Sequence, residues 1–326
     1  VLTVASNGLD ARYGTPFTSD NHYSPWKVDE QGRPITDPGV LQLESLVYGL
    51  FDHDRFGDII CNFVAFDEED GALTKRVAKP HQYFAVRRAV DRTLDAVASN
   101  GKAGVVWHTQ GSGKSMEMEL YTALVLTHPE LLNPTVVVIT DRKELDGQLF
   151  ATFQRSTLLP EQPVQVTTRA QLRSELTSRK TGGILFTTLQ KFSLSTDEAR
   201  VGADHPLLSD RHNVIVIVDE AHRSHYDDLD GYARHLRDAL PHATMIAFTG
   251  TPISFTDRIS SSEADLRASM SPNASDSTFA TLSPTCLIPK PNSTLSNGFF
   301  FDPSIPSSML SMLFSPKPSS SISSSR

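Results

Sequence analysis

The stretch Gly104-Val-Val-Trp-His-Thr-Gln-Gly-Ser-Gly-Lys-Ser115 decides how we expect this chain to fold. Residues 104–108 form a short apolar run typical of a buried strand, and residues 116–126 are apolar at helical spacing. The glycine-rich segment between them is therefore a turn from a strand to a helix. Gly111 and Gly113 can adopt backbone dihedrals that other residues resist, so successive N–H groups can point at phosphate oxygens.

The helix that begins near Lys114 places the positive end of its dipole at the same turn. Lys114 can neutralise the β- and γ-phosphates of a nucleotide, and the Ser115 hydroxyl can complete the shell of a Mg²⁺ ion. His108 stands where the strict form of this phosphate-binding pattern has its first glycine, so the match is incomplete. The alternative interpretation is a Gly/Ser turn that happens to precede a lysine.

A second predicted strand, residues 213–218, ends directly before two acidic residues. Its β-branched run is too apolar for a surface strand and suits the centre of a parallel sheet. Open α/β sheets bind their ligands at the carboxyl ends of the strands. Asp219 is therefore the candidate magnesium-side carboxylate, and Glu220 is the candidate base that orients the attacking water. The alternative is that the two acids only mark the start of a helix.

A third apolar run, residues 243–248, is followed by Thr249-Gly-Thr-Pro252. As a lone tetrapeptide this would be an ordinary turn, but small hydroxyl residues at such a strand end can relay the state of a γ-phosphate to bound nucleic acid. In this order, the three motifs indicate an ATP-driven nucleic-acid motor. We expect Ser115 and Asp219 to converge on one metal-bound triphosphate across adjoining strands.

Apolar runs and helical patterns alternate through the middle of the chain, which predicts an α/β fold with a parallel sheet and helices on both faces. The predicted strands are 104–108, 135–140, 164–168, 183–187, 213–218 and 243–248. Upstream, residues 40–51 form an amphipathic stretch that predicts a helix. From residue 258 the sequence becomes rich in serine and proline, and we expect this tail to be disordered.

The composition of the 326 residues restricts the partners of the chain. A net charge of −8 excludes a dominant basic surface, so any DNA contact must be local. Cys61 and Cys286 are far apart and lack metal-ligand spacing, which fits a reducing cytosol and a cytoplasmic location. No apolar run reaches membrane-spanning length, so we expect no membrane partner.

Taken together, the motifs resemble the motor part of the R subunit of type I restriction enzymes, the HsdR family, within the superfamily 2 helicases. Residues 107–115 are similar to the first motif of that family, including the histidine in the glycine position. Residues 137–148, 219–224 and 248–253 are similar to later motifs, among them a DEAH box. Residues 79–86 resemble its adenine-recognition element, which implies that Gln82 contacts the base.

The resemblance implies a division of the chain into three parts. Residues 1–75 correspond to a connector that follows a nuclease domain, and the nuclease core itself is absent from this sequence. Residues 76–257 correspond to the first RecA-like helicase domain, a P-loop NTPase fold. Residues 258–326 are a tail without family resemblance. We therefore expect an internal fragment that also lacks the second RecA-like lobe.

For the intact protein, the resemblance implies an ATP-dependent type I site-specific deoxyribonuclease. Such a translocase couples ATP hydrolysis, with Mg²⁺, to movement along double-stranded DNA and to restriction, and its partners are methyltransferase and specificity subunits. The alternatives are another superfamily 2 DNA helicase and a non-catalytic nucleotide-binding module.

The expected site residues fall into groups by role. The catalytic residues are Lys114, Asp219 and Glu220. The nucleotide-binding residues are Gln82, Gly111, Ser112, Gly113, Lys114 and Ser115, and those holding Mg²⁺ are Ser115 and Asp219. The residues that couple nucleotide state to DNA are His222, Thr249, Gly250 and Thr251. The DNA-backbone contacts are Arg142, Thr187, Thr188 and Gln190; alternatively, these threonines only pair with nearby backbone groups.

Overall fold

The computed structural model describes residues 2–69, 72–140, 147–200, 205–219 and 234–250. The serine- and proline-rich tail that is predicted to be disordered lies outside these residues. Within them, no helix is both long enough and apolar enough to cross a membrane.

Strands and helices alternate along most of the described residues. The strands are β1 (Thr3–Ser6), β2 (Ala11–Gly14), β3 (Val64–Glu69), β4 (Ala72–Val77), β5 (Lys102–Trp107), β6 (Thr135–Ile139), β7 (Val164–Gln165), β8 (Ile184–Thr187), β9 (Val214–Asp219) and β10 (Thr244–Thr249). The α-helices are α1 (Gln42–Leu50), α2 (His53–Asn62), α3 (Pro80–Val97), α4 (Lys114–Thr127), α6 (Gln148–Arg155), α7 (Arg169–Ser178) and α8 (Thr196–Arg200). The short 3₁₀ helices are η1 (Asp20–His22), η2 (Pro129–Leu131) and η3 (Leu189–Phe192).

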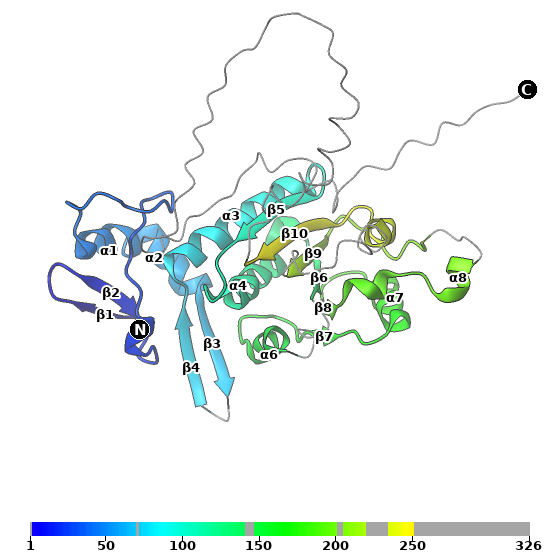
Figure 1. Cartoon of the computed structure of the whole chain (residues 1–326), viewed down its shortest axis with the longest axis horizontal. Coiled ribbons are helices and arrows are strands. Elements are labelled where there is room, and N and C mark those ends of the chain that lie inside the picture. The colour runs from blue at the N-terminus through cyan, green and yellow to red at the C-terminus, as the bar shows by residue number, and fades with distance from the viewer. Residues whose placement is uncertain (1, 70–71, 141–146, 201–204, 220–233, 251–326) are drawn as a thin grey trace, which may run out of the picture. The chain divides into compact units, whose positions relative to one another are not determined.

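Six of the described strands form one parallel sheet in the order β5-β10-β9-β6-β8-β7 (Figure 1). Each of the six apolar runs that predict strands contributes one of them, which confirms the predicted α/β sheet. β7 is shorter than its predicted range of 164–168 and keeps only two residues. The backbone N–H of Val166 still donates to the carbonyl of Phe186 at 2.8 Å.

The two faces of the sheet bury different side chains, because successive residues of a strand point to opposite sides. In β6, Val136 and Val138 belong to one apolar cluster, together with residues of α3 and α4. Val137 and Ile139 belong to a second cluster, with residues of α7 and of the helical segment 234–239. Helices therefore cover both faces, as predicted, and the strands between them are buried throughout.

The residues before the sheet form two antiparallel hairpins, β1–β2 and β3–β4, with α1 and α2 between them. The predicted helix at 40–51 is α1. Fully buried Trp26 packs beside Tyr13, Tyr83 and Phe84, with ring centroids 6.0, 6.4 and 6.1 Å away. Since Tyr83 and Phe84 lie on α3, the N-terminal segment shares one apolar core with the helix that leads into β5. The predicted boundary at residues 75 and 76 stays a prediction.

Two helical glycines provide a matched test of this packing. A Cβ on Gly49 in α1 would collide with the indole of Trp26, whereas a Cβ on Gly57 in α2 would meet no atom within 4 Å. We expect Gly49→Ala to lower the free energy of unfolding by about 1–3 kcal/mol, as overpacked cores do. Gly57→Ala should raise it by about 0.5–1 kcal/mol, because alanine favours the helix. Urea unfolding measures both, and equal effects at the two positions would contradict this packing.

Candidate functional site

The phosphate-binding turn has the backbone that its sequence predicts. It leaves β5 after Trp107 and enters α4 at Lys114. Gly111 has a φ of +83° and Gly113 a φ of +92°, and Gly113 is the residue that caps the N-terminus of α4. Both values lie in the left-handed region, which glycine alone enters without steric cost. The start of a helix favours an anion, because the positive end of the helix dipole lies there.

The ends of β5, β10 and β9 lie level with one another at the same edge of the sheet. Trp107 of β5 pairs with Thr249 of β10, and Phe248 of β10 pairs with Asp219 at the end of β9. The N–H of His108 also donates to the carbonyl of Thr249 at 3.2 Å. The expectation that Ser115 and Asp219 lie across adjoining strands is wrong, because β10 separates β5 from β9.

Several of the predicted site residues cannot be placed. Glu220, His222, Thr251 and Arg142 lie outside the described residues, so their roles stay predictions. Gly250 is described and forms a bend directly after β10.

The side chain of Gln82 is hydrogen-bonded to the phosphate loop. This residue stands in the first turn of α3, and its side chain is buried. Its Nε2 donates to the carbonyls of Ser112 and Gly113, at 3.3 Å each, while its Oε1 accepts from the N–H of Lys79 at 2.8 Å. The sequence did not indicate this contact with the loop. The predicted contact of Gln82 with adenine stays a prediction.

Three further side chains lie at the loop; the sequence did not indicate a role for two of them, His81 and Glu117, and indicated no partner for the third, His108. His81 donates from Nε2 to the Ser112 carbonyl at 3.1 Å, since a carbonyl can only accept. Burial lowers the pKa of His81, although the charge of Glu117 opposes this shift. The ring of His81 meets the ring of His108 edge-on, with centroids 5.2 Å apart. His108 Nδ1 in turn lies 2.6 Å from Oε1 of Glu117, in the first turn of α4.

Three of the residues predicted to contact DNA lie at the end of β8 and directly after it. Thr187 and Thr188 are almost completely buried, and Gln190 in η3 is exposed. The carbonyl of Thr187 accepts from the N–H of Thr140 at 3.0 Å, and Lys191 Nζ donates to the Thr188 hydroxyl at 3.4 Å. Of the three predicted contacts that the structure describes, Gln190 is the one whose side chain is exposed.

The loop residues fit a magnesium-bound nucleotide. A Cβ built on Gly111 would meet no atom within 4 Å, so the space beside this residue is open. The hydroxyl oxygen of Ser112 is buried without a hydrogen-bond partner among the described residues. Ser115 and Asp219 supply the hard oxygen ligands that Mg²⁺ prefers.

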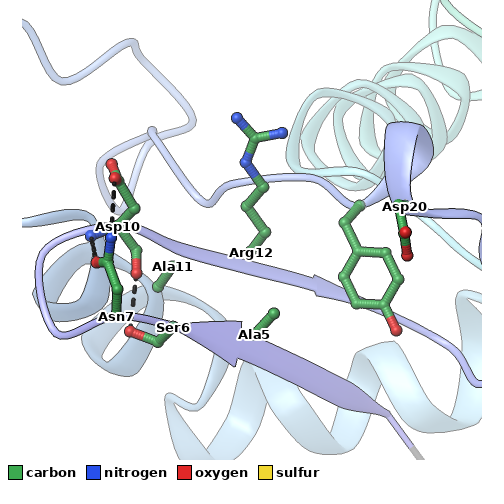
Figure 2. Close-up of a pocket in the computed structure, with 8 residues that line it drawn as sticks. Ala5, Ser6, Asn7, Asp10, Ala11, Arg12 and Asp20 are labelled. Carbon is green, nitrogen blue, oxygen red and sulfur yellow. Dashed lines mark hydrogen bonds between the residues drawn. The ribbon is translucent and has the colours of Figure 1, made fainter.

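A separate surface hollow of about 490 Å³ lies at the β1–β2 hairpin and is lined by none of the predicted site residues (Figure 2). Its polar groups largely satisfy one another. Asn7 Oδ1 accepts from the N–H of Asp10 at 2.7 Å, and the Ser6 hydroxyl donates to the Asp10 carbonyl at 2.8 Å. These contacts are typical of a turn that closes a hairpin.

Comparison with known proteins fits this geometry. The sequence pattern of the family described as SWI2/SNF2 ATPase matches residues 81–265, which is more than half of the chain. The chain belongs to the SWI2/SNF2 ATPase family. The match begins in α3 and includes the phosphate loop, Asp219 and Thr249.

Relatives of this SWI2/SNF2 ATPase domain include subunits of restriction enzymes, which confirms the resemblance inferred from the motifs. The HindI endonuclease subunit of a type I restriction enzyme from Haemophilus influenzae is 45% identical over 269 residues, covering 78% of this chain. A putative type I endonuclease subunit, MjaIXP, from Methanocaldococcus jannaschii is 35% identical over 277 residues, covering 79% of this chain. The matched region spans 25% of the length of each relative.

The solved Hef helicase domain of Pyrococcus furiosus aligns over 56% of this chain and 36% of its own, with 19% identity and a TM-score of 0.36.

Alanine at the two loop glycines tests the contact between Gln82 and the loop. Both glycines have positive φ, so either substitution should cost about 1–2 kcal/mol of stability. A Cβ on Gly113 would also displace the Gln82 amide, whereas one on Gly111 enters open space. We expect Gly113→Ala to lose about 1 kcal/mol more than Gly111→Ala in chemical unfolding, through the lost hydrogen bonds. A larger loss of unfolding free energy in Gly111→Ala than in Gly113→Ala would contradict the contact between Gln82 and the loop.

Proposed function

We propose that this chain is the first RecA-like motor lobe of the R subunit of a type I restriction enzyme, where it binds ATP with Mg²⁺. One observation carries the proposal: a loop with two left-handed glycines opens α4 at the sheet edge where β9 presents Asp219. Both features face one edge because β10 holds the two strands in register.

In this proposal each residue has a distinct role. The N–H groups of Gly111 and residues 113–115 bind the phosphates, while the Ser112 N–H donates to the Thr109 carbonyl at 3.1 Å. Lys114 neutralises the phosphate charge. Ser115 and Asp219 hold Mg²⁺, and the bound ion supplies further neutralisation of the phosphates. Glu220 orients the attacking water.

Residues after β10 and β8 connect the nucleotide to DNA. Thr249 and Gly250, with Thr251 and His222, would sense the nucleotide and transmit its state to the DNA-binding loops. Thr187, Thr188, Gln190 and Arg142 would contact the phosphodiester backbone.

The intact protein would couple ATP hydrolysis to translocation along double-stranded DNA and would act as an ATP-dependent type I deoxyribonuclease. It would cleave with a separate nuclease domain, in a cytoplasmic complex with methyltransferase and specificity subunits. The names of two relatives, which are type I endonuclease subunits, support this part of the proposal. Residues 1–75 would be the connector between nuclease and motor, and residues 76–257 the motor lobe.

Replacing Lys114 tests nucleotide binding. We expect Lys114→Ala to weaken Mg–ADP binding about tenfold or more, because it removes a charged partner of the phosphates. Exposed Lys180 offers a control, since Lys180→Ala removes the same charge away from the loop. Isothermal titration calorimetry measures both. Equal affinities of the two variants would contradict the proposal, and an absence of binding by the unaltered chain would support a non-catalytic module.

Turnover by these residues alone should be low. In two-lobed motors the cleft between the lobes completes the site, and the second lobe supplies charge that stabilises the transition state. We expect the chain to release phosphate slowly and with little stimulation by DNA, as measured by malachite green. Fast DNA-stimulated release that Lys114→Ala abolishes would show that one lobe suffices.

A further inference from the structure

A buried pair of side chains connects the two ends of the phosphate loop. His108 directly precedes the loop and Glu117 follows it in α4. Nδ1 of His108 lies 2.6 Å from Oε1 of Glu117, and their side chains are 4% and 0% exposed. With Glu117 ionised, the imidazole must donate, because a carboxylate only accepts.

A carboxylate at such depth is costly unless its interactions offset the lost hydration. Oε1 of Glu117 has His108, but Oε2 has no hydrogen-bond partner among the described residues. Its position in the first turn of α4 lowers the cost only in part, through the helix dipole. An apolar residue would fill this place at lower cost, so stability alone does not explain a glutamate at this position.

The pair contacts His81 of α3, and His81 and its neighbour Gln82 both donate hydrogen bonds to carbonyls of the loop. His81 packs edge-on against His108 and donates to the Ser112 carbonyl, and Gln82 donates to the carbonyls of Ser112 and Gly113. In a trans peptide the C=O and N–H point in opposite directions. Holding the Ser112 carbonyl toward α3 therefore turns the N–H of Gly113 away from α3. The Gly113 carbonyl is held by Gln82 and also accepts from the N–H groups of Met116 and Glu117 in α4.

We propose that Glu117 is a positioning residue for nucleotide binding: through His108, it holds the phosphate loop in the conformation that presents its N–H groups to a polyphosphate. The histidine in the usual glycine position is then the contact through which Glu117 acts. This inference rests on the proposed nucleotide site. It adds His108 and Glu117 as residues that contact neither the nucleotide nor the metal. They affect the affinity for nucleotide through the conformation of the loop.

The experiment compares two buried glutamates of the same helix in the full 326-residue chain. Glu119 also has a 0% exposed side chain on α4, but it pairs with Arg76 of β4 at 3.0 Å instead of with the loop. We expect Glu117→Gln to weaken Mg–ADP binding about fivefold to tenfold, because the glutamine oxygen still accepts from His108 but a charged hydrogen bond becomes a neutral one. Glu119→Gln should lower stability and leave the affinity for Mg–ADP unchanged. Calorimetric titration measures affinity, and urea unfolding without nucleotide measures stability.

Variants of His108 show whether Glu117 acts through it. His108→Gly restores the strict glycine pattern and removes the pair, so it should weaken Mg–ADP binding at least as much as Glu117→Gln does. The double variant should bind no worse than His108→Gly alone, since both substitutions act on one contact. His108→Asn retains an N–H near the Nδ1 position and should recover most of the affinity.

Three results would overturn the inference. In the first, Glu117→Gln binds Mg–ADP normally while Lys114→Ala does not, which leaves the proposed nucleotide site intact. In the second, affinity falls in parallel with stability in both the Glu117 and Glu119 variants, which makes the pair structural. In the third, Lys114→Ala itself binds normally, which removes the proposed nucleotide site along with the inference.

Discussion

The parallel pairing of β10 with both of its neighbours is the constraint on which the site depends. β10 pairs with β5 on one side and with β9 on the other, and all three strands end at nearly the same level. The phosphate loop and Asp219 therefore reach the same edge of the sheet, although β10 lies between their strands. What keeps this arrangement in place is the burial of the strands between two helical layers, since β10 is buried along its whole length. Apolar packing of the strands that carry Asp219 and the loop therefore sets the level at which both reach this edge.

The strands could be predicted from the sequence because their physical cause is local. Runs such as residues 135–139 and 214–218 are β-branched and uninterrupted, and segments with turn residues separate them. The pairing order could not be predicted in the same way. β5 and β10 are neighbours although more than a hundred residues lie between them, and no periodicity within either strand encodes its partner. The assumption that β5 adjoins β9 failed for this reason.

The same distinction separates the site residues that could be predicted from the sequence from those that could not. The left-handed glycines of the loop follow from the properties of glycine, so Gly111 and Gly113 could be identified from their spacing alone. The residues behind the loop could not, because their function depends on which helices pack together. Glu117 lies in a helix that is buried on several sides, so its charge does not mark a solvated face as it would on an amphipathic helix. A signal was present, however: two acidic residues, at 117 and 119, interrupt an otherwise apolar helix directly after a phosphate-binding sequence.

A crystal structure of the chain with Mg–ADP tests the central claim most directly. The β-phosphate should lie within hydrogen-bonding distance of the N–H groups of Gly111 and residues 113–115. Mg²⁺ should lie about 2.0–2.1 Å from the Ser115 hydroxyl, with Asp219 bound directly or through one water. A nucleotide bound elsewhere, or a metal beyond the reach of both Ser115 and Asp219, would contradict the central claim.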